Sequence, residues 1–143
     1  MILAAPLASC GSQPSLSAYR TGFQNQRIQA QSLGRDVVTS LLTAHNKSNS
    51  QLANEFAGLA SHTNQIASNL RKLDPPSKYK SQNSQLASDF TSVAGDMSSI
   101  SRAATAGDAP GARAARLKLD QDLAKLGQVS RSLAGSLGLP VSR

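Results

Sequence analysis

Apolar residues recur along most of the chain at alternating intervals of three and four, the spacing that places them on one face of a helix. The clearest example lies between Leu52 and Leu73, where the intervals are 4, 3, 4, 3, 4 and 3. This heptad seam consists of Leu52, Phe56, Leu59, Thr63, Ile66, Leu70 and Leu73. A second seam of the same kind consists of Tyr79, Asn83, Leu86, Phe90, Val93, Met97, Ile100 and Ala104. Neither segment shows the strict alternation of a strand, so both are predicted to be amphipathic helices.

Two flanking segments have broader and less regular apolar faces. The first holds Leu16, Tyr19, Phe23, Ala30, Leu33, Val37, Leu41 and Ala44, and is broadened by Ile28, Val38 and Leu42. The last holds Leu119, Leu123, Leu126, Leu133 and Leu137, with Leu117 and Val129 beside them. Glycines interrupt the predicted helices at Gly22, Gly34, Gly58, Gly95, Gly127 and Gly135. Each costs about 1 kcal/mol relative to alanine, and close approach of neighbouring helices is the expected compensation at several of them.

Start and stop signals separate these segments. Ser48 and Gln51 have the spacing of a capping box before the second helix. Asp74 is predicted to cap the third helix, with Pro75 at its first position. A left-handed glycine stop at position 107 and an aspartate cap at position 108 are expected between the third and fourth helices. Gly138 and Pro140 end the fourth. The predicted helices span about 16–44, 50–73, 75–106 and 109–136.

Short connections make consecutive helices antiparallel, so the sequence predicts an all-α, up-down-up-down four-helix bundle over residues 16–139. Residues 140–143 form a tail. A longer coiled coil or an intertwined oligomer is the alternative, and the three proline or glycine breaks argue against it. The 143 residues include only two Tyr, three Phe and no Trp, so the core is expected to be mainly aliphatic side chains and alanine.

The N-terminal segment contains the one cysteine of the chain. Leu7, Ala8, Ser9 and Cys10 resemble the lipobox of bacterial lipoproteins, an apolar residue followed by two small residues and a cysteine. The resemblance implies a diacylglyceryl group on the Cys10 thiol, cleavage just before it, and anchoring at the extracytoplasmic face of a bacterial membrane. Residues 1–9 then correspond to a signal-peptide remnant, and residues 10–15 to the lipidation site and a short polar tether.

Residues 1–9 carry no charge, whereas a signal peptide begins with a positive segment. The true start is therefore expected upstream. The alternative is a cytosolic protein with an incidental cysteine.

The chain has 15 Lys and Arg against 8 Asp and Glu, a net charge of +7. Such a charge suits anionic partners, and on the cytosolic alternative the basic last helix suggests non-specific nucleic-acid binding. No specific nucleic-acid target is predicted.

The bundle topology places the tether, the turn between the second and third helices, and the C-terminus at one end. Four basic residues around that turn, Arg71, Lys72, Lys78 and Lys80, are predicted to contact anionic lipid head groups. Arg20 and Arg143 reinforce this end, and Asp74 is the acidic residue there. The alternative is that they are ordinary solvated helix termini, where Arg71 and Lys72 complement the helix dipole. Loops 45–50 and 106–111 face away and are the expected contact region for an unidentified envelope protein.

No catalytic group, metal site or cofactor is predicted, and the expected role is a non-catalytic interaction or structural one. Glu55 is the one glutamate of the chain, which excludes a four-helix di-metal carboxylate site. Asp89 and Asp96 lie seven residues apart and are expected on a solvated polar face. A carrier of haem or of a small apolar molecule is the alternative function, with Met97 and His62 as the possible axial ligands.

Overall fold

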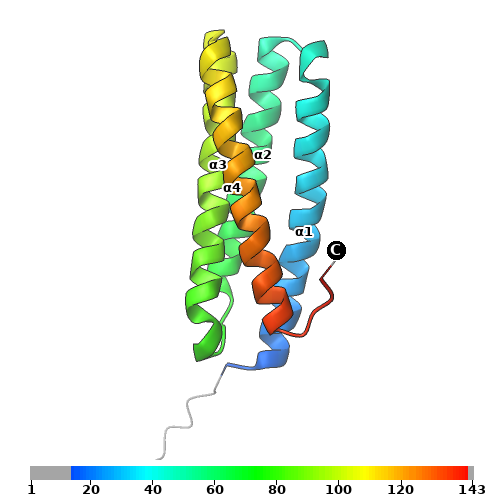
Figure 1. Ribbon diagram of the computed structural model, residues 1–143, viewed down its shortest axis with the longest axis vertical. Coiled ribbons are helices and arrows are strands. Elements are labelled where there is room, and N and C mark those ends of the chain that lie inside the picture. Colours follow the sequence, from blue (N-terminus) through cyan, green and yellow to red (C-terminus); the bar gives the residue numbers. More distant parts are fainter. Residues whose placement is uncertain (1–13, 142–143) are drawn as a thin grey trace, which may run out of the picture.

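The computed structural model describes residues 14–141, in which four long helices run alternately up and down (Figure 1). This confirms the predicted all-α four-helix bundle, and the described residues contain no strand. Two short 3₁₀ turns, η1 and η2, precede α2 and α3 in the chain. The elements are α1 (Leu16–Thr43), η1 (Ala44–Asn46), α2 (Asn49–Lys72), η2 (Ser77–Tyr79), α3 (Lys80–Ala106) and α4 (Ala109–Ser136).

Three of the predicted helix boundaries form as the sequence indicates. At the start of α2 the Ser48 hydroxyl accepts from the Gln51 backbone N–H at 3.2 Å, and the Gln51 side-chain oxygen accepts from the Ser48 N–H at 2.8 Å. This is the reciprocal capping box. After α3, Gly107 adopts a left-handed φ of 66°. The Asp108 carboxylate then accepts from the Gly111 N–H at 3.0 Å and caps α4.

The predicted start of the third helix at residue 75 was wrong. Residues 74–76 lie outside any helix, the η2 turn follows, and α3 begins only at Lys80. The reason is the second proline. Pro75 precedes Pro76, and a residue before proline is kept out of the helical region. Asp74 therefore caps no helix, and α3 begins after Tyr79 without a side-chain cap.

The core lies mainly between α2 and α3, because almost all of their predicted seam residues are buried. Leu52 and Leu73, at the two ends of the α2 seam, are half-buried. The outer helices bury narrower stripes than predicted. Ile28, Val38 and Leu42 of α1 are 56%, 55% and 69% exposed, and Leu117 of α4 is 65% exposed. These four residues do not broaden the core face as the sequence pattern suggested.

The helix packing explains these exposed residues. α2 packs extensively against α3, and α3 against α4, whereas α1 packs mainly against α2 and has no comparable packing against α4. In Figure 1, α4 crosses obliquely over the bundle and approaches α1 only near the end where α1 begins. With one principal neighbour, α1 has no partner for the outer half of its apolar surface.

Of the six glycines at positions 22, 34, 58, 95, 127 and 135, only Gly22 permits a close approach by another element. A Cβ at this position would lie 2.6 Å from Leu73 Cδ2, so the glycine gives the end of α2 room to pack against α1. A Cβ on Gly34, Gly58, Gly95 or Gly135 would meet no other atom within 4 Å. The expected compensation by close helix approach is therefore absent at these four positions.

Candidate functional site

One end of the bundle gathers the start of α1, the turn between α2 and α3, and the end of α4 (Figure 1). We call this the tether end and define it by residues 14–20, 71–80 and 136–138. Cys10 lies outside the described residues, six positions before the first residue of α1. The basic residues Arg20, Lys72, Lys78 and Lys80 are all exposed, as is Asp74. The start of α1 and the turn between α2 and α3 thus share one end of the fold as predicted. The C-terminal residues do not stay there, because the chain after α4 turns back alongside α1, where Val141 lines a groove with Arg27 and Ala30 (Figure 1). Arg143 lies outside the described range.

The four residues predicted for lipid contact differ in their surroundings. Arg71 donates from Nη2 to Thr91 Oγ1 at 2.7 Å and to the Ala87 carbonyl at 3.5 Å, so its guanidinium is held along the side of α3. Lys78 Nζ lies 4.8 Å from the centroid of the Tyr79 ring, within cation–π range. Lys72 and Lys80 are exposed and form no ion pair within the described part of the chain.

A buried tyrosine network holds the tether end together. The Tyr19 hydroxyl donates to Asn83 Oδ1 at 3.1 Å, and Asn83 Nδ2 donates to the Leu70 carbonyl at 2.9 Å. The Tyr79 hydroxyl donates to the Ser136 carbonyl at 3.1 Å, and its ring stacks on Tyr19 with centroids 5.9 Å apart. Burial, and secondarily Tyr79, raises the pKa of Tyr19 to about 12. These contacts join all four helices and fix the position of the turn that carries Lys78 and Lys80.

The α3–α4 interface contains two buried carboxylates, which corrects the prediction of a solvated face. Asp89 is 4% exposed and Asp96 is 5% exposed. Asp89 Oδ1 pairs with Lys125 Nζ at 2.9 Å, and Asp96 Oδ1 pairs with Lys118 Nζ at 2.9 Å. The Oδ2 atom of each aspartate has no hydrogen-bond partner among the described residues. The heptad spacing of the two acids was the available signal, because it places both on one helix face.

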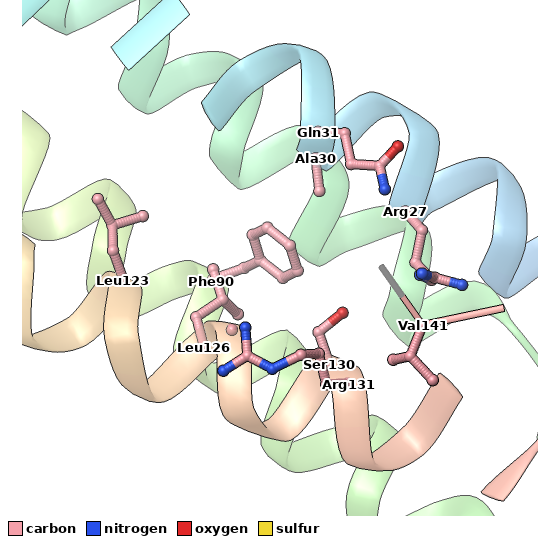
Figure 2. A pocket seen from close by; sticks show the side chains of 10 residues that line it. Arg27, Ala30, Gln31, Phe90, Leu123, Leu126, Ser130, Arg131 and Val141 are labelled. Carbon is pink, nitrogen blue, oxygen red and sulfur yellow. The ribbon is translucent and has the colours of Figure 1, made fainter. Parts of the chain in front are cut away.

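A groove of about 270 Å³ lies between α1 and α4, where the two helices diverge (Figure 2). Its floor is the Phe90 ring of α3, with Leu123 and Leu126 of α4 beside it (Figure 2). Two guanidinium groups, those of Arg27 and Arg131, lie at its rim (Figure 2). The remaining lining residues are Ala30, Gln31, Gly127, Ser130 and Val141. Sequence reasoning missed this groove, because it depends on how far apart α1 and α4 lie.

The opposite end of the bundle, which we call the distal end and define by residues 43–50 and 104–111, has a larger apolar hollow. It measures about 550 Å³ and lies between the two predicted contact loops. Leu52, Ile100 and several alanines form its walls, and His45 and Arg113 also line it. Short alanine side chains leave this end of the bundle incompletely filled.

Met97 and His62 do not converge on one site. Met97 is fully buried, and its Sδ accepts from Thr63 Oγ1 at 3.4 Å. His62 is exposed and lines a surface hollow between α1 and α2.

Residues 14–141 contain no group of three or more His, Cys, Asp or Glu side chains placed to hold a metal ion. Among these residues, no helix is both long enough and apolar enough to cross a membrane.

Comparisons of the chain with protein-family models, with curated proteins and with solved structures found no match.

Proposed function

We propose that this protein is a lipid-anchored, extracytoplasmic lipoprotein whose helical bundle has a non-catalytic interaction or structural role in the bacterial cell envelope. Cys10 is the proposed attachment point. The tether end is the proposed membrane-facing surface, and the distal end is the proposed contact region for an envelope protein.

The observation that carries this proposal is the position of the basic residues relative to the start of α1. Residues 11–15 link Cys10 to α1, and five residues of extended chain reach roughly 15 Å. A lipid on Cys10 would therefore hold the tether end close to the head groups. Lys72, Lys78 and Lys80 are exposed at that end. Each basic side chain near an anionic surface contributes about 1 kcal/mol and would add to the attraction of the lipid anchor.

Vesicle binding of the protein without lipid tests the membrane-facing surface. We expect binding to vesicles that contain anionic lipid, and weaker binding at high salt. The triple variant Lys72→Gln/Lys78→Gln/Lys80→Gln should bind roughly 100-fold more weakly, since about 3 kcal/mol of attraction is lost. The matched control is Arg102→Gln/Arg113→Gln/Arg116→Gln, which removes the same charge from exposed positions in the distal half of α3 and α4. Equal loss in both variants would show an unoriented charge effect and contradict the proposal.

Mass spectrometry of the native protein tests the anchor itself. A mature chain that begins at Cys10 and carries a diacylglyceryl group supports the proposal. A native chain that retains residues before Cys10 without modification contradicts it.

A further inference from the structure

We propose that the groove between α1 and α4 binds a single-chain amphiphile with a carboxylate head group. The alkyl chain would lie on Phe90, Leu123 and Leu126, and the carboxylate would lie between Arg27 and Arg131. This inference goes beyond the envelope role and does not depend on lipid attachment at Cys10.

The two positive charges at the rim of the groove favour a negatively charged ligand. Arg27 Nη1 donates to Gln24 Oε1 at 3.0 Å, and its Nη2 donates to the Pro140 carbonyl at 2.9 Å. Both acceptors are neutral, so they orient the guanidinium without compensating its charge. Among the described residues, neither Arg27 nor Arg131 pairs with a carboxylate. A carboxylate ligand would supply the missing negative charge through charge-assisted hydrogen bonds.

Small residues create the space for the ligand. Ala30 on α1 and Ser130 on α4 line the groove, at positions where larger side chains would fill the gap between the helices. The Arg131 guanidinium lies beside Gly127, where a Cβ would be 3.4 Å from Nη1, an ordinary van der Waals distance. Arg131 extends along α4 over the groove (Figure 2). Phe90 is 5% exposed and gives the groove an apolar floor.

The size and rim chemistry limit the class of ligand. Pockets for small molecules commonly measure about 300–1,000 Å³, so the volume of about 270 Å³ suits one alkyl chain better than a lipid with several chains. The remaining polar side chains at the rim, Gln31 and Ser130, are uncharged donors or acceptors. The lining residues include no acid that would repel a carboxylate.

Titration of the full chain with sodium decanoate, kept below its micelle-forming concentration, tests the inference. We expect saturable changes in the amide NMR signals of Ala30, Phe90, Leu123 and Gly127. Decanol has the same chain without the charge and should bind about 10-fold more weakly, a difference of about 1.4 kcal/mol. Decyltrimethylammonium should bind more weakly still.

Two arginine variants and one control show whether the rim recognises the head group. Arg131→Gln and Arg27→Gln should each weaken decanoate binding about 10-fold and leave decanol binding unchanged. The Arg131 guanidinium forms no ion pair among the described residues, and the Pro140 carbonyl accepts from Arg27, so the Arg131 variant tests charge without loosening the tail at Pro140. Arg102→Gln removes the same charge on α3, away from the groove lining, and should have no effect.

Three results would overturn the inference. They are equal affinity for decanoate and decanol, equal loss of affinity in Arg102→Gln, and signal changes confined to the distal hollow. The vesicle assay with the lysine variants is independent, because the Arg27→Gln and Arg131→Gln variants retain every lysine of the tether end. Failure of the groove inference and failure of the envelope proposal are therefore distinguishable.

Discussion

Lys118 of α4 bridges two carboxylates, Asp96 of α3 at 2.9 Å and Asp122 of its own helix at 2.8 Å. The pKa values of the two aspartates shift in opposite directions. Hydrogen bonds to Asp122 and Asp96 hold the pKa of Lys118 above its ordinary range, and Lys118 lowers the pKa of Asp122. Burial nevertheless raises the pKa of Asp96, because desolvation outweighs its attraction to Lys118. The ion pair therefore offsets only part of the cost of burying the Asp96 charge.

The two partners of the Asp96–Lys118 ion pair should affect stability differently when each is replaced. Asp96→Asn removes the buried charge, and Lys118 keeps Asp122 as its partner. We expect this variant to be at least as stable as the wild type near pH 7, with a change within about 1 kcal/mol. Lys118→Ala leaves Asp96 buried and unpaired and should lower stability. Urea denaturation measures both, with Lys80→Ala as an exposed, unpaired lysine control. A clearly destabilised Asp96→Asn variant would show that the ion pair stabilises the fold.

The same carboxylate predicts a pH dependence. Because the pKa of Asp96 is raised in the folded state from its ordinary value of 3.8, folding takes up a proton between these two values. The penalty from Asp96 is therefore absent below that window and fully present above it. Any stability advantage of Asp96→Asn near pH 7 should shrink as the pH falls toward about 4. Parallel stability curves for the two proteins across this range would contradict the assigned cause.

Tyr19 predicts an alkaline transition. Its pKa is raised to about 12 from 10.0, so the folded state disfavours the phenolate. Stability that depends on neutral Tyr19 is complete below pH 10.0 and is lost as the pH rises toward 12. The chain has only two tyrosines, so absorbance titration of the two single Tyr→Phe variants assigns the Tyr19 phenolate. We expect the component near pH 12 to disappear in Tyr19→Phe and to persist in Tyr79→Phe.

The capping box at the start of α2 predicts a position-specific loss of stability. Ser48→Ala removes the hydroxyl that accepts from the Gln51 N–H, and should lower the free energy of unfolding by about 1 kcal/mol. Ser50→Ala, two residues later and exposed, is the control and should change stability little. Denaturant titration measures both. Equal effects of the two substitutions would rule out a cap-specific contribution.

Replacing two glycines by alanine should change stability in opposite directions. Gly107 has a φ of 66°, which L side chains rarely adopt, so Gly107→Ala should lower stability by about 1 kcal/mol. Gly58 is exposed within α2, and a Cβ there would meet nothing within 4 Å. Gly58→Ala should raise stability by about 1 kcal/mol, because alanine has the higher helix propensity. Thermal unfolding of the two variants gives the comparison, and the same sign for both would contradict the assigned backbone roles.

The sequence was sufficient for the features that depend on local periodicity and capping. The heptad seams identified the buried faces of α2 and α3, because neighbouring helices cover almost all of each seam. Ser48 with Gln51, and Gly107 with Asp108, marked helix ends through contacts made within a few residues. The Asp74 cap was wrong because two successive prolines extended the turn. Short connections were enough to predict that the start of α1 and the turn around Lys78 share one end.

The tertiary structure alone decided which apolar and charged side chains of the outer helices find a partner. Val38 and Leu117 have the spacing of core residues but are exposed, because α1 and α4 diverge. Asp96 looks like a surface residue in sequence, yet α4 covers it and supplies Lys118. The groove beside Phe90 exists for the same reason as these exposed residues. Periodicity specifies the face that a helix buries, but the distance to its neighbour depends on the packing of all four helices together.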